Sequence, residues 1–282
     1  MKEYASQFTP AHLMAVCAAR EIKDNETAIV GIGLPLIAAI IAREDHARRA
    51  TIIFEGGTIG TRSRRMPWSI SDSANSDFTQ ACMEVWRILG DQQAGYLDVG
   101  IVGGAQIDRF GNLNSTVILG QGDYAHPKVR MPGSGGGNDI ASSCKRTIIM
   151  MRLRKNNFVP RVDYITAPGH LDGGGARRKA GLKGNGPAVV VTDHGIFRFH
   201  EETKEMYLDQ IIDYAKLDAV REMVGWELKV APELGLMEPP TRRQMEIMER
   251  FDPLGVVLGS GDDLNLDDFD EFVNTLERGL NA

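Results

Sequence analysis

Cysteine is scarce in this 282-residue chain, which has only Cys17, Cys82 and Cys144. The three lie far apart and form no CxxC pair, and an odd number does not suit a framework of disulfides. The first ten residues contain no apolar run, so we read no signal peptide there. We therefore expect a reduced, cytoplasmic setting.

The chain also lacks a long hydrophobic run and an excess of positive charge. Its longest apolar stretch spans 15 residues, 28–42, and contains Gly31, Gly33 and Pro35, whereas a membrane-spanning helix needs about 20. The net charge is −6, so we expect neither membrane nor nucleic acid as a partner. With 43% hydrophobic and 25% charged residues, the composition is globular and excludes chain-wide disorder, collagen or coiled coil.

Several familiar catalytic and metal signatures are missing. The six histidines form no HExxH motif, and no Cys/His spacing typical of zinc is present, so we expect no metal. Ser134 is not in a GxSxG elbow, because Pro132 takes the first position. The glycine-rich segment around Ser134 is not followed by the Lys-Ser/Thr pair of a Walker loop.

Glycine, by contrast, is abundant: 31 of 282 residues, about 11% against a usual value of about 7%. Short apolar runs at 27–32, 51–54 and 99–102 each lead into glycine, and two more apolar runs follow at 147–151 and 188–192. Helical patterns separate the runs. Alternation of this kind predicts an α/β fold with a mostly parallel open sheet and helices on both faces. Ligands in such sheets bind beyond the carboxyl ends of the strands.

The first expected helix begins at Pro10 after the cap Thr9 and turns Leu13, Val16 and Cys17 to one face. The other expected helices are 35–43, 77–89, 217–224 and 242–251. Helix 77–89 would turn Cys82, Val85, Trp86 and Leu89 inward, and residues 60–77 before it read as a polar surface loop. A hairpin is expected at His194-Gly195. We predict one domain over residues 1–258 and a solvated acidic extension over 259–282.

The segment from Gly31 to Leu36 has three readings. It follows a strand, opens a helix and has the acidic Glu55 about 20 residues on, which imitates the dinucleotide-binding fingerprint. However, Leu36 replaces the third glycine, and Pro35 removes an N–H where a pyrophosphate needs donors. The other readings are a tight turn without a ligand and a turn that lines an acyl or thioester site.

Glu55 follows a buried strand directly and is itself followed by Gly56 and Gly57. A carboxylate can attack an activated acyl group and form a covalent intermediate. The neighbouring glycines would leave room for a bulky thioester and expose N–H groups that can stabilise an oxyanion. The alternative is an acidic residue that simply meets solvent or caps a helix.

A second glycine-rich segment runs from Gly133 to Asp139 and has the sequence GSGGGND. Such a segment is costly to order, so an unconstrained loop is one reading. The other is a nest of N–H groups that faces an anion or a carbonyl oxygen. Gly103-Gly104-Ala105 is a weaker segment of the same kind.

Together these pieces resemble the β subunit of a glutaconate-type class I CoA-transferase. The segments that carry the resemblance are GIGLPLI (31–37), IIFEGG (52–57), GGAQID (103–108), GNLNST (111–116), HPK (126–128), GSGG (133–136), TIIMM (147–151), DYITAPG (163–169) and VVTD (190–193). They occur in the family's order over roughly residues 10–255. The resemblance implies a fold of the NagB/RpiA/CoA-transferase type and an α-subunit partner, with the active site at their interface.

The resemblance also implies a mechanism. In the β subunit, a glutamate attacks an acyl-CoA and forms an acyl-glutamyl anhydride, which CoA converts to a glutamyl-CoA thioester that passes CoA to a second carboxylic acid. Glu55 stands at the matching position. CoA is then a substrate, and no cofactor is bound permanently. The glycines that would bind the oxyanion or CoA are Gly31, Gly33, Gly103, Gly104, Gly133, Gly135 and Gly136.

Three departures from the family pattern are present. Gly56 replaces the usual serine or asparagine, residues 58–70 diverge, and the acidic tail is extra. The divergent segment carries Arg62, Arg64 and Arg65, which either lie in a solvated loop or pair with a second substrate carboxylate. Relatives without the glutamate hydrolyse or decarboxylate acyl-CoA, so an acyl-CoA hydrolase, lyase or decarboxylase is the alternative function. A non-catalytic metabolite sensor is a third hypothesis. Retention of Glu55 favours transfer.

Overall fold

The computed structural model describes residues 2–70 and 72–259. The helices are α1 Pro10–Arg20, α2 Leu34–Asp45, α3 Val85–Gln93, α4 Gly137–Ser143, α5 Ala176–Lys179, α6 Leu217–Glu222 and α7 Arg242–Phe251, with the 3₁₀ helix η1 Ser73–Ser76. The longer strands are β1 Thr27–Ile29, β2 Thr51–Ile53, β5 Val99–Val102, β10 Arg146–Met150, β11 Pro187–Val191, β12 Gly195–Phe199, β13 Met206–Ile211 and β14 Lys229–Leu236. The two-residue strands are β3 Thr58–Ile59, β4 Ala81–Cys82, β6 Gln106–Ile107, β7 Leu113–Asn114, β8 Val117–Ile118 and β9 Val129–Arg130.

One large sheet organises the chain, with strand order β14-β13-β12-β11-β10-β5-β1-β2-β3-β4. Its central strands, β2, β1, β5, β10 and β11, are all parallel neighbours. The order runs outward in both directions from the adjacent pair β1 and β5, as in a doubly wound sheet. Antiparallel strands extend it on both sides: β3 and β4 beside β2, and the β11–β12 hairpin at one end of the parallel block. The expected mostly parallel sheet and the hairpin near His194-Gly195 are both confirmed.

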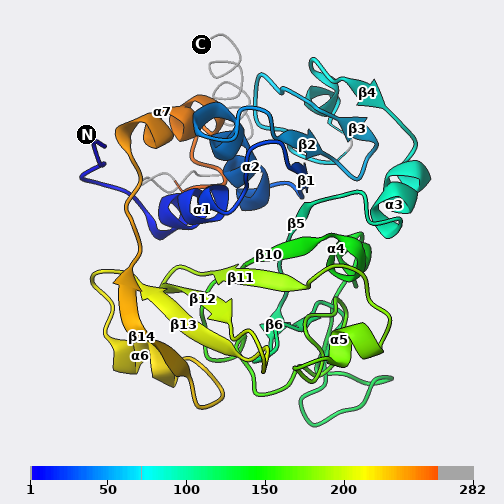
Figure 1. The fold of residues 1–282 in the computed structure, drawn as a ribbon, viewed down its shortest axis with the longest axis vertical. Helices are drawn as coiled ribbons and strands as arrows, with labels where there is room; N and C mark the ends of the chain where they lie inside the picture. The colour runs from blue at the N-terminus through cyan, green and yellow to red at the C-terminus, as the bar shows by residue number, and fades with distance from the viewer. Residues whose placement is uncertain (1, 71, 260–282) are drawn as a thin grey trace.

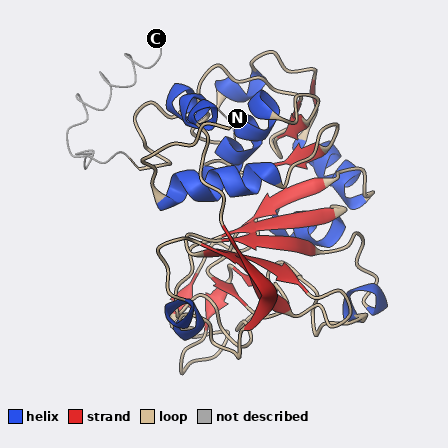
Figure 2. Ribbon diagram, turned by 60° about the vertical axis from the view of Figure 1, so that its left-hand side comes forward, coloured by secondary structure: helices blue, strands red, loops and turns tan. Residues whose placement is uncertain are grey.

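Helices cover both faces of the sheet, as expected (Figures 1 and 2). Alternate strand residues face opposite sides, so Ala28 and Ile52 belong to a core with α1, α2 and α7. Ile29 and Ile53 belong to a second core with Ile88 of α3 and with Ile140 and Ala141 of α4. Each central strand is therefore buried on both faces, which explains why these strands read as continuous apolar runs rather than as alternating ones.

Local sequence signals fix the ends of several helices. Thr9 caps α1 through its side chain, which accepts a hydrogen bond from the N–H of His12, and Pro10 is the first helical residue, as predicted. Thr241 caps α7 in the same way through the N–H of Gln244. Gly33 precedes α2 with φ +89°, a conformation that glycine adopts without strain.

The predicted helix 77–89 is wrong in both its start and its inner face. Residues 81–82 form β4, which pairs with β3, and Phe78 has φ +48°, which a helix cannot accommodate. The helix is α3, which begins at Val85 and buries Ile88 and Gln92. Cys82, Val85 and Trp86 are exposed, with Trp86 67% exposed. Hydrophobic spacing alone could not reveal that these side chains face outward.

The loop 60–77 is only partly a surface loop. Thr61, Ser63 and Met66 are buried, and the hydroxyl groups of Thr61 and Ser63 donate to the backbone carbonyls of Asn75 and Ala74. The segment therefore folds back on itself.

Strands β13 and β14 were not predicted from the sequence. The predicted acidic extension lies, apart from Gly259, outside the described residues.

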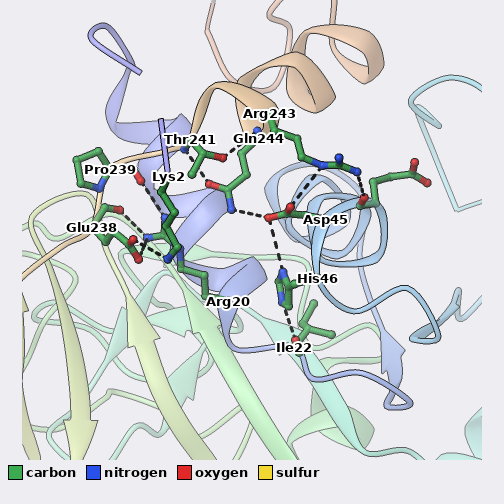
Figure 3. A network of polar contacts seen from close by, with 11 residues as sticks. Lys2, Arg20, Ile22, Asp45, His46, Glu238, Pro239, Thr241, Arg243 and Gln244 are labelled. Carbon is green, nitrogen blue, oxygen red and sulfur yellow. Dashed lines mark hydrogen bonds and ion pairs between the residues drawn. The ribbon is translucent and has the colours of Figure 1, made fainter. Parts of the chain in front are cut away.

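A network of polar contacts joins the two ends of the described chain (Figure 3). Arg20 at the end of α1 donates to the carbonyls of Glu238 and Pro239, at 2.6 and 2.8 Å, and Lys2 pairs with Glu238 at 2.9 Å. Gln244 of α7 donates to Asp45 of α2 at 2.9 Å. The contacts anchor the β14–α7 connection on α1 and α2, so α7 covers the same face as those helices.

Candidate active site

Glu55 sits on a tight turn just past the carboxyl end of β2. The N–H of Gly57 donates to the carbonyl of Phe54 at 3.0 Å, and the N–H of Phe54 donates to the carbonyl of Thr58 at 3.0 Å. Only glycine fits behind the carboxylate: a Cβ on Gly56 would lie 2.6 Å from the carbonyl oxygen of Ile70, and one on Gly57, where φ is +115°, would collide with the carbonyl of Met83. The turn therefore holds Glu55 at the edge where parallel strands end.

The glycine-rich segment before α4 meets this carboxylate. A Cβ added to Gly136 would collide with Oε2 of Glu55 and would lie 3.3 Å from its Cδ. The carboxylate therefore lies directly on the Gly136 backbone, in space that only glycine leaves open. No hydrogen bond or ion pair engages the Glu55 side chain within the described part of the chain. The sequence analysis identified the Glu55 turn and the glycine-rich segment 133–139 as separate candidates, and in the structure they are in contact.

Free backbone donors stand beside Glu55. The N–H groups of Gly135 and Gly136 have no partner among residues 2–70 and 72–259, and Gly135 has φ +48°. The segment is nevertheless ordered: Gly133 anchors it by donating to the carbonyl of Ser115 at 2.9 Å, and Gly137 closes a turn within it by donating to the carbonyl of Ser134 at 2.8 Å. An ordered turn with unpaired N–H groups is suited to receive a negative oxygen.

The other predicted glycines follow β1, which is next to β2, and β5, which is next to β1. Gly31 and Gly33 both face open space. In contrast, Gly103 and Gly104 allow close packing: a Cβ on Gly103 would lie 2.9 Å from the carbonyl oxygen of Met150, and one on Gly104 would lie 3.2 Å from that of Asn114. Close packing therefore requires glycine at positions 103 and 104, whereas Gly31 and Gly33 border space that a ligand could occupy.

The three arginines of the divergent segment point to different places. Arg65 donates to both carboxylate oxygens of Asp72, at 2.9 and 2.7 Å, and this holds the pKa of Asp72 far below its usual range. Arg64 pairs with Asp77 at 3.5 Å. Arg62 is exposed and lines a separate cleft with other arginines. Two of the three guanidinium groups thus already have a carboxylate partner.

Two residues with exposed apolar side chains pack against the Glu55 turn. Ile70 and Met83 supply the carbonyls that Gly56 and Gly57 face, and their side chains are 42% and 38% exposed. Val85 and Trp86, which follow Met83 in the chain, are 50% and 67% exposed. Exposed apolar side chains of this size are typical of an interaction surface. The resemblance implied an interface at the active site, but the helical spacing had turned Trp86 inward, so its place on the exposed surface was not expected.

Neither a metal cluster nor a membrane span is found in the described chain. No group of three or more His, Cys, Asp or Glu side chains in residues 2–70 and 72–259 is placed to hold a metal ion. No helix in this part is long and apolar enough to cross a membrane.

Comparison with known proteins defines the class. The profile of the family described as Coenzyme A transferase matches residues 12–223. The β subunit of glutaconate CoA-transferase from Acidaminococcus fermentans is 39% identical over 262 residues, which cover 90% of this chain and 96% of that protein. The β subunit of 3-oxoadipate CoA-transferase from Pseudomonas knackmussii is 35% identical over 250 residues, which cover 88% and 94%.

The solved structures agree with the sequence comparison. The crystal structure of glutaconate coenzyme A-transferase from Acidaminococcus fermentans superposes with a TM-score of 0.83 and 36% identity, over 92% of this chain and all of that one. The chain belongs to the coenzyme A transferase family. It is an enzyme that transfers CoA between an acyl-CoA and a carboxylic acid.

Proposed function

We propose that this chain is the β subunit of a heteromeric CoA-transferase in which Glu55 is the nucleophile. The observation that carries the proposal is the Glu55 carboxylate, which is unpaired among the described residues and lies against Gly136 beside the free N–H groups of Gly135 and Gly136. The domain that does this chemistry spans residues 1–258, and the reaction takes place in the cytoplasm.

Glu55 acts in two stages. A carboxylate oxygen attacks the thioester carbonyl of the acyl-CoA, the C–S bond breaks, and CoA leaves as a thiolate, so that an acyl-glutamyl anhydride forms. The thiolate then attacks the Glu55 carbonyl; the donor acid leaves as its carboxylate, and a glutamyl-CoA thioester remains. The acceptor acid reverses both steps. One thioester is made for each one broken, so the exchange needs no other energy source.

The glycine segment stabilises the oxyanion of each tetrahedral intermediate. The N–H groups of Gly135 and Gly136 would donate to the oxygen on which negative charge develops, and Gly133 holds the segment in place. Removal of one such donor typically costs about 10² to 10³ in rate. Gly31, Gly33, Gly103 and Gly104 lie at the neighbouring strand ends and line the path of the CoA chain. CoA itself is a substrate and not a resident cofactor.

A dicarboxylic acid is the proposed acceptor class. The acids named for the two relatives, glutaconate and 3-oxoadipate, carry two carboxylates each. One carboxylate would react with CoA, and the other needs a cation. The residues that we propose for it are Arg62, Arg64 and Arg65; Arg64 and Arg65 would have to exchange Asp77 and Asp72 for the ligand.

An α subunit is the proposed partner, and the apolar side chains around Glu55 are the surface it covers. Both relatives are named as one subunit of their enzyme, which implies a second subunit. Ile70 and Met83, whose carbonyls face the glycines behind Glu55, are exposed, and so are Val85 and Trp86, which follow Met83 in the chain. A partner on this surface would bury them and exclude water from the anhydride. It would also supply part of the acyl pocket.

Intact mass spectrometry of the complex with its α subunit tests the proposal. After incubation with a panel of acyl-CoAs, we expect a mass gain equal to CoA less water, which Glu55→Gln abolishes without unfolding the protein. Free CoA or CO₂ that accumulates without an acceptor acid would instead assign an acyl-CoA hydrolase or decarboxylase. No adduct and no turnover, with every donor tested, would refute the nucleophile.

A further inference from the structure

A cleft lined by arginines lies at the amino end of β2, the end opposite Glu55. Its volume is about 240 Å³. Four arginines contribute to its wall, together with residues of β2 and of the segments beside it: Arg43, Arg48, Arg49, Arg62, Ala50, Thr51, Ile52, Gly60 and Gln80. The cleft is therefore separate from the reacting carboxylate. Arg62 is also one of the three residues proposed for the second carboxylate of the acceptor, and a phosphate bound in the cleft would leave that role to Arg64 and Arg65.

The positive charge in this cleft is only partly neutralised. Arg49 pairs with Asp24 at 2.7 Å, and Arg43 contacts Glu44 at 3.4 Å. The guanidinium groups of Arg48 and Arg62 have no hydrogen-bond or ion-pair partner in the described chain. Two positive charges are therefore left facing a concave surface.

Arg43 adds an unmet donor to the wall. Its side chain is 7% exposed, and Nε has no partner within the described chain, although the guanidinium also donates to the carbonyl of Thr61. An unsatisfied buried donor costs roughly 1–3 kcal/mol. Burial, and secondarily the charge of Arg62, lower the pKa of Arg43. An anion in the cleft would offset the repulsion between the guanidinium groups of Arg43 and Arg62.

We propose that this cleft binds a small phosphate-bearing anion. A phosphate group carries up to two negative charges, which matches the two unpaired arginines, and its tetrahedral oxygens accept from several guanidinium groups at once. A carboxylate would be satisfied by a single arginine. The volume is below the roughly 300–1,000 Å³ of sites for drug-sized ligands, so the cleft fits a phosphate and not a whole nucleotide. The phosphate comes either from one end of a larger ligand, such as the 3′-phosphate of CoA, or from free inorganic phosphate.

Isothermal titration calorimetry tests the site: inorganic phosphate is titrated at low salt into the full chain in complex with its partner subunit. We expect Arg48→Ala and Arg62→Ala each to weaken binding by roughly tenfold or more, since a hydrogen bond to a charged group contributes about 1.5–3 kcal/mol. Both side chains are exposed, so the variants should fold. Arg221→Ala, an exposed and ion-paired arginine on α6, is the matched control. Absence of phosphate binding, or equal affinity in all four proteins, would overturn the proposal.

A second titration with CoA and 3′-dephospho-CoA identifies the source of the phosphate. If the CoA phosphate occupies the cleft, its removal and Arg62→Ala weaken CoA binding equally and the two losses are not additive. If free phosphate is the ligand, neither removal of the 3′-phosphate nor Arg62→Ala changes the affinity for CoA, while Arg62→Ala still weakens the binding of inorganic phosphate. Both results support the site. Because the readout is binding and not turnover, the outcome is independent of whether Glu55 is the nucleophile.

Discussion

The substitution Gly136→Ala tests the geometry of the site, because the one methyl group that it adds points at the Glu55 carboxylate. Gly136 has φ −74° and ψ −5°, which alanine adopts without strain. The added Cβ would collide with Oε2 of Glu55, so the carboxylate must move aside by about 1 Å. A displacement of that size at a reacting group can cost about 10²-fold in rate. Because the displaced atom is the end of a flexible side chain, we expect unfolding free energy to change by less than about 1 kcal/mol.

Gly137→Ala is the matched control. A Cβ there meets nothing within 4 Å, and the residue is the first of α4, so alanine should leave activity unchanged and stabilise the helix by up to about 1 kcal/mol. The assay is single-turnover formation of the glutamyl-CoA adduct, with thermal unfolding measured in parallel. Adduct formation at the wild-type rate in Gly136→Ala, or equal impairment in Gly137→Ala, would refute the geometric argument.

Three further predictions concern the surface and the interior. Trp86→Asp should leave the isolated chain folded but weaken its association with the partner by roughly 30-fold, since a central tryptophan often contributes about 2 kcal/mol or more; an unchanged Kd in a pull-down titration would remove Trp86 from the interface. Arg177 is 5% exposed and donates to the carbonyls of Gly169, Ala141 and Lys183. Arg177→Ala should therefore lower unfolding free energy by about 3 kcal/mol or more, and an unchanged urea midpoint would contradict this. Burial lowers the pKa of His170 to about 4. The contribution of neutral His170 to the free energy of unfolding is therefore complete above about pH 6.5 and falls by up to about 3 kcal/mol as the pH drops toward and below 4. A His170→Gln variant whose free energy of unfolding declines with the same slope at acid pH would exclude His170 as the cause.

The strand ends of the sheet could be predicted because each carries its own local signal. A buried parallel strand reads as a short apolar run, and a strand that ends at a ligand edge is followed by glycine. Both conditions held at residues 51–57, so Glu55 could be placed from sequence. The contact between Glu55 and Gly136 could not be predicted, because the two residues are far apart in the chain and meet only once α4 packs against the sheet that contains β2.

The errors have a physical origin as well. Residues 77–89 have helical apolar spacing, but the spacing does not say whether an apolar face turns toward the core or toward a partner. The turn at Phe78 and the pairing of Cys82 with Thr58 decide the local structure through backbone hydrogen bonds that leave no compositional trace. Strands β13 and β14 were missed because their burial patterns are irregular, so neither reads as an apolar run or as a clean alternation.

The central claim is that CoA becomes bonded to Glu55, and peptide mapping of the trapped complex tests it most directly. After incubation with an acyl-CoA, digestion and tandem mass spectrometry should place a modification equal to CoA less water on the peptide that contains Glu55. Cys82 is an exposed thiol on β4, which lies beside this turn, and a mixed disulfide there would add CoA less two hydrogens instead. A CoA group found on Cys82 or on any carboxylate other than Glu55 would contradict the account.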